Sequence, residues 1–232
     1  MIIVDGKMPD FAKAKLAECG HLLELETSGI TYPAISGHPD IFFCPTRAGL
    51  IVAPDLPEEY FSLLDLHRIK YRKGETAVGS AYPQTAPFNA VVTSKYIIHN
   101  LKLTDPLLLK ACEGLTPIHV NQGYTRCNLL VLDENLFVSS DKGICNTLLD
   151  HDLHCHYFPP HEIKLEGFSN GFLGGACGIW DQKLFMCGSL KYHSWGQQFR
   201  EIIEAEDLAI IELIDKPLMD VGSIIFFEQL NN

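Results

Sequence analysis

The sequence lacks a long hydrophobic run and is poor in basic residues. No apolar stretch in its 232 residues approaches the roughly 18 residues that a membrane-spanning helix needs. Asp5 stands where a signal peptide would carry basic residues. Lys and Arg number 18 against 29 Asp and Glu, which gives a formal net charge of −11. Because nucleic-acid binding requires a basic stripe, we expect a cytoplasmic protein that binds neither nucleic acid nor membrane.

The eight cysteines form no C-x-x-C pair, so a disulfide framework is not expected and the thiols should be free. Four histidines lie close together at His151, His154, His156 and His161. On a strand, His154 and His156 would share a face and could hold zinc with a third ligand, but the spacing matches no standard zinc motif. We therefore expect no metal and no cofactor.

What the sequence does contain is a unit that recurs about every 40 to 50 residues. Each copy has an apolar strand, a polar turn, a second strand, a helix and a third strand. Four copies span 36–73, 87–122, 124–158 and 172–214, and their first strands open at Asp40-Ile41-Phe42-Phe43, Asn89-Ala90-Val91-Val92, Asn128-Leu129-Leu130-Val131 and Cys177-Gly178-Ile179-Trp180. Such a period predicts units that are stacked or arranged radially.

A fifth unit is split between the two ends of the chain, at 218–232 and 1–27. Ser223 to Phe227 supplies a first strand, and Met1 to Val4 supplies the second, followed by a helix from Pro9 to Cys19 and a strand from His21 to Thr27. Pairing these ends would close a ring and protect its sheet edges. The sequence therefore predicts a single circular domain over 1–232 whose termini meet.

Local signals refine the elements within the units. Thr104-Asp105-Pro106 is typical of a helix start, and Asp141 and Ser194 are placed to cap two further helices. Arg68 to Tyr71 alternates as a strand. The nearly continuous apolar run from Ala209 to Leu213 predicts a strand that is buried on both faces.

Five such units resemble the pentein fold of the guanidino-group-modifying enzymes, an α/β propeller of five ββαβ pseudo-repeats. The resemblance is architectural, covers essentially the whole chain, and is nearest to an uncharacterised family grouped with those enzymes. The superfamily includes arginine deiminase, agmatine deiminase, dimethylarginine dimethylaminohydrolase and amidinotransferases, together with a non-catalytic relative that binds the ribosome. Fold alone therefore does not assign a function.

In a five-fold ring the first strands start near the axis, so their first residues should converge on an axial cavity. We call these residues the hub: Asp40, Asn89, Asn128, Cys177 and Ser223. Convergent polar groups in an apolar channel indicate a ligand pocket, although small polar residues also begin many strands. Residues that precede the hub add chemistry: His38, Arg126, Cys127 and Asn170. On a strand, Arg126 and Cys127 would point to opposite faces.

The resemblance implies a cysteine nucleophile, a histidine acid/base and carboxylates that hold a guanidinium. This chain departs from that pattern, because the nucleophile position reads Asp220-Val221-Gly222-Ser223 and the histidine position reads Phe172-Leu173-Gly174. One alternative is a protein that only binds a small, cationic molecule, with Asn89, Asn128, Arg126, Cys127, Asn170, Asp220 and Ser223 as binding residues. Another is a cysteine-dependent hydrolase or transferase whose reaction centre has moved around the pseudo-symmetric ring to a different unit; we call this the rotated centre. In it Cys177 is the nucleophile, His38 is the acid/base, and Asp40 or Asp220 binds the cation. A third is an interaction module like the ribosome-binding relative. The oligomeric state stays open.

Overall fold

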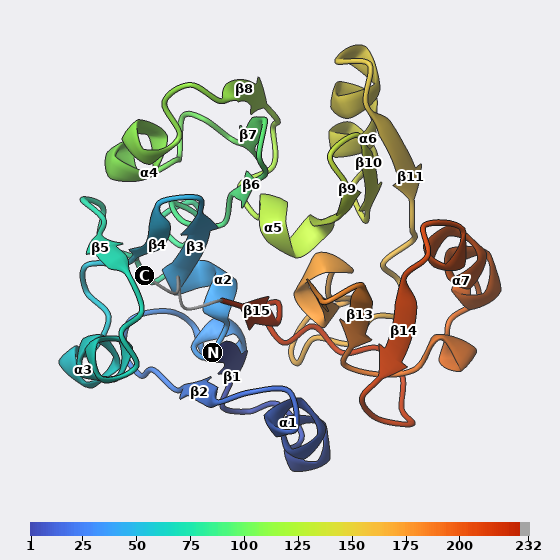
Figure 1. Cartoon of the computed structure of the whole chain (residues 1–232), viewed down its shortest axis with the longest axis horizontal. Helices are drawn as coiled ribbons and strands as arrows, with labels where there is room; N and C mark the ends of the chain where they lie inside the picture. The colour runs from blue at the N-terminus through green and yellow to red at the C-terminus, as the bar shows by residue number, and fades with distance from the viewer. Residues whose placement is uncertain (228–232) are drawn as a thin grey trace.

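Each of the five predicted units forms its own three-stranded sheet in the computed structural model, which describes residues 1–227. In every sheet the middle strand pairs antiparallel with one neighbour and parallel with the other. The sheets surround a common axis (Figure 1). They consist of β3 (Phe43–Thr46), β4 (Gly49–Val52) and β5 (Tyr71–Lys73); β6 (Val91–Val92), β7 (Tyr96–His99) and β8 (Thr116–His119); β9 (Leu129–Asp133), β10 (Leu136–Ser139) and β11 (His154–Tyr157); β12 (Cys177–Trp180), β13 (Lys183–Met186) and β14 (Ala209–Glu212); and β15 (Ile225–Phe226), β1 (Ile2–Asp5) and β2 (Leu22–Leu25).

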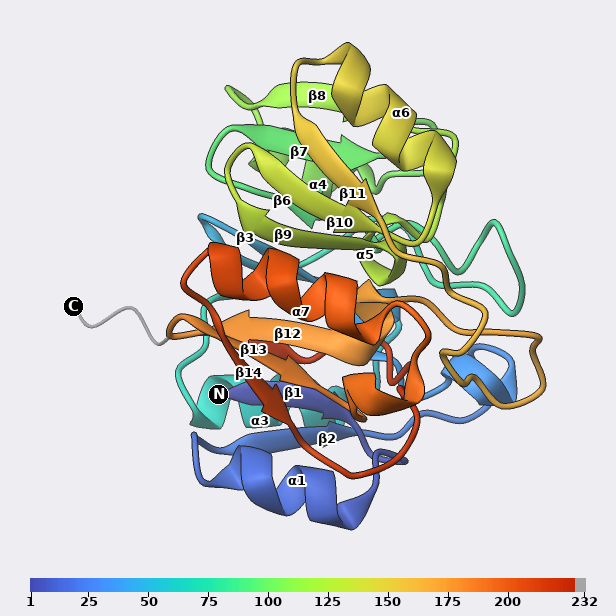
Figure 2. The same ribbon diagram turned by 90° about the vertical axis from the view of Figure 1, so that its right-hand side faces the viewer.

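A helix links the second strand of each unit to the third, because two parallel neighbours need a crossover connection. These helices are α1 (Asp10–Ala17), α3 (Glu58–Leu66), α4 (Pro106–Ala111), α6 (Lys142–Asp150) and α7 (Gly196–Ala205). They lie at the periphery of the ring (Figure 1). The side view shows α7 against the outside of the sheet of β12, β13 and β14 (Figure 2). The predicted ββαβ unit is thereby confirmed five times over.

Ring closure occurs at the ends of the described chain. Strand β1 pairs antiparallel with β15, with Ile2 opposite Phe226 and Ile3 opposite Ile225. Met1 N donates to Phe227 O at 2.9 Å, and Phe227 N donates to Met1 O at 2.9 Å. The prediction that the two ends meet in one sheet is confirmed. Residues 228–232, which the sequence assigned to the fifth unit, lie outside the described residues.

Two of the three predicted helix starts are correct. Asp105 accepts a hydrogen bond from Leu108 N at 3.1 Å, and Asp141 accepts one from Ile144 N at 3.2 Å. Each aspartate therefore caps its helix. Ser194 does not cap α7, which begins two residues later without a side-chain cap; its backbone N–H instead donates to Glu162 Oε2 at 2.6 Å.

Other local expectations were wrong. The first and third units enter their first strands through single helical turns, α2 (Pro39–Phe42) and α5 (Thr125–Asn128), where the sequence predicted extended chain from Asp40 and Asn128. The third strand of the first unit is Tyr71–Lys73, not 68–71. Strand β14 is partly exposed along its length, because it is the outer edge of its sheet and only one neighbour pairs with it.

Apolar side chains fill the space between neighbouring sheets. The largest cluster joins the first two units with the fifth and contains the fully buried Phe42, Phe43 and Phe88. Burial of one such ring contributes about 1.5–3 kcal/mol to stability. These contacts pack the first, second and fifth units against one another and so hold their hub residues in place. Within residues 1–227, none of the helices has the length and apolarity to cross a bilayer.

Candidate functional site

The five hub residues are buried at the centre of the ring, and three of them are joined by hydrogen bonds. Each hub side chain is at most 2% exposed. Ser223 Oγ donates to Asp40 Oδ2 at 2.7 Å, and Asn89 Nδ2 donates to the backbone oxygen of Asp40 at 3.0 Å. Residues from the first, second and fifth units therefore meet at Asp40, as the ring geometry predicted.

Cys127 completes this network. Its Sγ donates to Asp40 Oδ2 at 3.0 Å, and Asn89 Nδ2 donates to that sulfur at 3.2 Å. Burial, and next the negative charge of Asp40, raise the pKa of the Cys127 thiol well above its ordinary value. In the free protein the sulfur therefore keeps its proton and directs it at the carboxylate.

The Cys127 side chain lines a cavity of about 130 Å³ that we call the thiol cavity. His38 and Asp220 line it as well, together with aromatic side chains from three loops. Its full lining is Tyr32, Ile35, His38, Ile41, Tyr124, Cys127, Leu165, Phe168, Asn170, Phe172 and Asp220. Among the described residues that form it there is neither a lysine nor an arginine.

His38 lies between two buried carboxylates. Its Nε2 is 3.7 Å from Asp5 Oδ2, and its Nδ1 is 3.9 Å from Asp220 Oδ1. Burial lowers the pKa of His38 to about 4, so the imidazole is neutral near pH 7. Burial, followed by repulsion from Asp40, raises the pKa of Asp220 to about 7, and burial raises that of Asp5 to about 6. A neutral base and a carboxyl that titrates near neutrality are suited to moving protons.

Backbone donors fix the orientation of Asp220. Phe172 N donates to Oδ2 at 2.9 Å, and Gly222 N donates to Oδ1 at 3.0 Å. At Gly175, an added Cβ would come within 2.0 Å of Asp220 Oδ1. The absence of a side chain at Gly175, and likewise at Gly171, leaves room for the Asp220 carboxylate.

Asp40 carries an acceptor that the protein does not use. Its Oδ2 accepts from Cys127 and Ser223, whereas its Oδ1 is buried and has no hydrogen-bond partner among residues 1–227. A buried polar atom without a partner is costly. Asp40 is not among the residues that line the thiol cavity, so this unused acceptor lies behind the Cys127 thiol.

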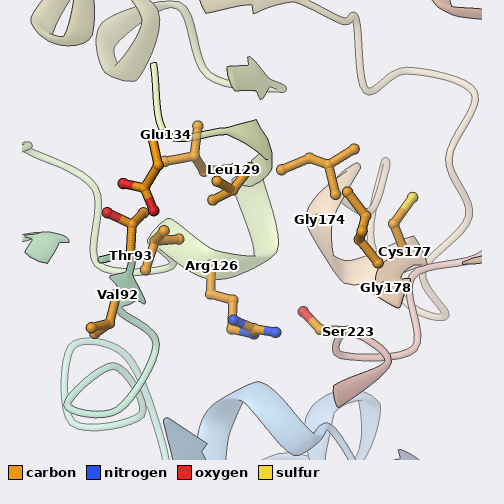
Figure 3. Close-up of a pocket in the computed structure, with 13 residues that line it drawn as sticks. Val92, Thr93, Arg126, Leu129, Glu134, Gly174, Cys177, Gly178 and Ser223 are labelled. Carbon is orange, nitrogen blue, oxygen red and sulfur yellow. The ribbon is translucent and has the colours of Figure 1, made fainter. Parts of the chain in front are cut away.

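Cys177 and Arg126 are among the residues that line a second cavity of about 260 Å³, which we call the strand cavity (Figure 3). The first strands β6, β9 and β12 form its walls. Its lining is Val91, Val92, Thr93, Arg126, Leu129, Leu130, Val131, Glu134, Gly174, Cys177, Gly178, Ile179 and Ser223. Burial raises the pKa of the Cys177 thiol, so this sulfur is protonated as well.

The structure therefore divides the predicted site residues. Cys127, His38, Asn170 and Asp220 line the thiol cavity, whereas Arg126, Cys177 and Ser223 line the strand cavity. Within residues 1–227, no hydrogen bond or ion pair connects Cys177 to His38, and the two residues line different cavities.

Two predicted binding residues lie behind the cavity walls. Asn89 supports Cys127 from the side of the core. The Asn128 amide donates to the backbone oxygen of Tyr124 at 2.8 Å, and so fixes the turn that carries Cys127. Both roles concern the position of the thiol.

Sequence reasoning missed Asp5 and the aromatic wall of the thiol cavity. Asp5 ends the apolar run of β1, and a carboxylate that closes a buried strand is the one available signal for it. Tyr32, Tyr124 and Phe168 come from loops that lack periodicity, so nothing in the pattern placed them together.

The histidine cluster between His151 and His161 has no metal-binding arrangement. The described residues contain no group of three or more His, Cys, Asp or Glu side chains placed to hold a metal ion. His154 and His156 do share a face of β11, as expected, and both are exposed. All eight cysteines are free thiols, as predicted.

Solved structures of three enzymes resemble this fold. Dimethylarginine dimethylaminohydrolase from Pseudomonas aeruginosa, in complex with citrulline, aligns with a TM-score of 0.58 at 12% identity, over 92% of this chain and 91% of that chain. Agmatine deiminase from C. jejuni aligns with a TM-score of 0.53 at 12% identity, over 91% of this chain and 74% of that chain. An amidinotransferase of saxitoxin biosynthesis from Microseira wollei aligns with a TM-score of 0.53 at 11% identity, over 95% of this chain and 93% of that chain. At these identities the likeness shows the fold.

The sequence profile of one family, described as a family of unknown function (DUF6873), matches residues 3–225, while no curated protein matches the chain. The match spans all five units and includes both halves of the split one. The chain therefore belongs to the family DUF6873, and it has the pentein fold of the guanidino-group-modifying enzymes.

Proposed function

We propose that this protein binds a small organic cation, a guanidino or amine compound, in the thiol cavity. The observation that carries the proposal is an excess of buried acceptors. Asp220 lines the cavity, while Asp5 and Asp40 lie behind its lining residues His38 and Cys127. Each of the three carboxylates is at most 5% exposed, and Asp40 Oδ1 has no partner among residues 1–227. Because no lysine or arginine lines the cavity, a planar cation with several N–H donors would supply both the missing charge and the missing donors.

The walls of the thiol cavity support the same ligand. Tyr32, Phe168 and Phe172 face it, and aromatic faces attract a cation that has left water. His38 and Asp220 also line a neighbouring cavity of about 440 Å³, to which Lys7 and Lys164 contribute. The smaller cavity suits a cationic head group, and the larger one has room for the remainder of the molecule.

Calorimetric titration with methylguanidine, butylamine and acetamide tests the binding proposal. We expect the two cations to bind and neutral acetamide not to bind. Asp220→Asn should weaken cation binding by about tenfold, the effect of losing a charged hydrogen-bond partner. The matched control is Asp150→Asn, which removes the same charge from an exposed helix end. Equal binding of acetamide, or equal affinities in the two variants, would overturn the proposal.

A second candidate function is cysteine-dependent hydrolysis or transfer of an amidino group. It is favoured by the position of Cys127, whose sulfur contacts Asp40 and lines the same cavity as His38. A bound guanidinium would offset the carboxylate charge that keeps the thiol protonated, so that Asp40 or His38 could accept the proton.

The reaction then balances in two stages. The Cys127 sulfur forms a bond to the guanidinium carbon, and the bond to one nitrogen breaks as that nitrogen leaves as an amine with the proton held by the base. Water then adds to the same carbon and the C–S bond breaks. This returns the thiol and leaves a urea-type product, or an amidino product where an amine replaces water.

Intact-mass spectrometry during incubation with agmatine and with methylguanidine tests this candidate. We expect a covalent adduct on Cys127, or release of ammonia or amine that Cys127→Ala abolishes. Cys177→Ala, which removes a buried thiol of the strand cavity, should leave both signals intact. If a cation binds but neither an adduct nor a product forms, the result would support the binding function and contradict the catalytic one.

A further inference from the structure

The strand cavity contains charged groups that the proposed cation site does not use. Residues 1–227 have three buried side-chain nitrogen or oxygen atoms without a hydrogen-bond partner. One is Asp40 Oδ1, and the other two, Arg126 Nε and Glu134 Oε2, belong to residues that line the strand cavity. Native proteins satisfy most buried polar atoms, so two unsatisfied ones of opposite charge in one cavity indicate a missing ligand.

The turn α5 directs Arg126 away from the thiol. Successive residues of a helical turn point about 100° apart, so Cys127 lines the thiol cavity while Arg126 lines the strand cavity. Figure 3 shows the Arg126 side chain extending toward Ser223 at the centre of the ring. The Arg126 guanidinium and the Cys127 thiol thus belong to different cavities.

Arg126 has no counter-ion in the described chain. Within residues 1–227, no ion pair and no side-chain hydrogen bond involves its guanidinium, although arginine remains charged at all physiological pH values. Neighbouring groups do not neutralise it, because Cys177 is a protonated thiol and the Ser223 hydroxyl proton is donated to Asp40. The free fork has the geometry that binds a carboxylate through two hydrogen bonds.

Glu134 is the complementary group. Its Oε1 accepts a hydrogen bond from Ser94 N at 3.2 Å, whereas its Oε2 is buried without a partner. Figure 3 shows it beside Thr93, away from the end of the Arg126 side chain, and no ion pair within residues 1–227 joins the two. Apolar side chains including Val92, Leu129 and Ile179 line the cavity with them.

We infer that the strand cavity binds a small zwitterion of the aliphatic amino-acid class, with its carboxylate on Arg126 and its ammonium group on Glu134. Such a ligand satisfies both unpartnered groups and brings no net charge into a partly enclosed site. The volume of about 260 Å³ is suited to a small ligand. This site is separate from the thiol cavity, so the protein would hold two small molecules in different cavities.

Calorimetric titration with a chain-length series, glycine, β-alanine and 4-aminobutyrate, tests the inference, with butyrate and inorganic phosphate as anionic probes that carry no ammonium group. We expect at least one zwitterion to bind more tightly than either anionic probe. Arg126→Gln and Glu134→Ala should each weaken that binding by about tenfold or more. The matched control Arg72→Gln, which removes an exposed arginine of β5, should leave the affinity unchanged.

Near-ultraviolet circular dichroism of each variant, and the charge-conserving Arg126→Lys, separate loss of binding from loss of fold. Arg126→Lys should retain measurable binding because the positive charge remains. Tighter binding of phosphate or butyrate than of all three amino acids would overturn the inference, and so would an affinity that Arg126→Gln leaves unchanged. Asp220→Asn should weaken the binding of methylguanidine without changing the affinity for the zwitterion. A failure of the proposal for the thiol cavity can therefore be told apart from a failure of the inference for the strand cavity.

Discussion

Single buried residues determine how the folded protein responds to pH. The pKa of Asp220 rises on folding from 3.8 to about 7, so the folded state binds its proton more tightly than the unfolded state does. That contribution to stability is fully present below about pH 4 and is lost as the pH rises through 7. His38 and His99 act in the opposite sense, because burial lowers the pKa of each from 6.5 to about 4. Their contribution is lost as the pH falls below 6.5.

Between pH 6.5 and pH 8, the titration of Asp220 should therefore dominate. We expect the free energy of unfolding to fall by about 1 kcal/mol over this interval, and Asp220→Asn to remove most of that fall. Urea unfolding at closely spaced pH values measures it, with Asp150→Asn as the control. A slope that Asp220→Asn leaves unchanged would show that another group causes it.

A second residue-scale prediction concerns the reactivity of Cys127. The charge of Asp40 helps to keep the pKa of this thiol high, so Asp40→Asn should lower that pKa and speed alkylation by iodoacetamide at pH 8. Ser223→Ala removes the other hydrogen-bond donor to Asp40 but leaves the charge in place. Peptide mass spectrometry after timed labelling should show faster modification of Cys127 in Asp40→Asn alone. Equal rates in the two variants would assign the effect to packing.

At the scale of elements, the sequence predicted the repeating parts of the units and not the turns between them. Alternating apolar residues and capping aspartates identified strands and helices, because these patterns extend over several residues. The turns α2 and α5 have four residues each, which is too short for a helical period to be visible. The mistake mattered, because the direction of Cys127 depends on α5, and the thiol cavity could not be predicted without it.

The contact between α6 and β11 gives an element-scale prediction. Cys145 Sγ lies 2.7 Å from Cys155 Sγ, and the hydrogen bond between the two thiols lowers the pKa of Cys145. Hydrogen peroxide should oxidise this pair to a disulfide: the two thiols lose two hydrogen atoms, and the peroxide is reduced to two molecules of water. Alkylation followed by peptide mapping should show both thiols protected after peroxide and exposed again after dithiothreitol. Cys145→Ser should leave Cys155 open to alkylation throughout, and a wild-type pair that stays alkylable would contradict the prediction.

At the scale of the whole molecule, a closed ring has no preferred starting point. The backbone atoms of Met1 and Phe227 are within hydrogen-bond distance, so a short Gly-Ser linker could join these ends without disturbing β1 or β15. New termini could be placed between Glu113 and Gly114, in an exposed turn where Gly114 has a positive φ and open space around its Cα. All five sheets would keep their pairings, although the fifth unit would become continuous and the second would be split.

We therefore expect this circular permutant to fold, with a near-ultraviolet circular dichroism spectrum like that of the wild type and the same response to methylguanidine. Its melting temperature should change by only a few degrees, because the opened turn contributes little buried surface. As a control, a second permutant opened between Cys127 and Asn128, inside the buried turn α5, should fail to fold or lose both cavities. Folding of the second permutant and failure of the first would show that the native ends have a role beyond closing the sheet.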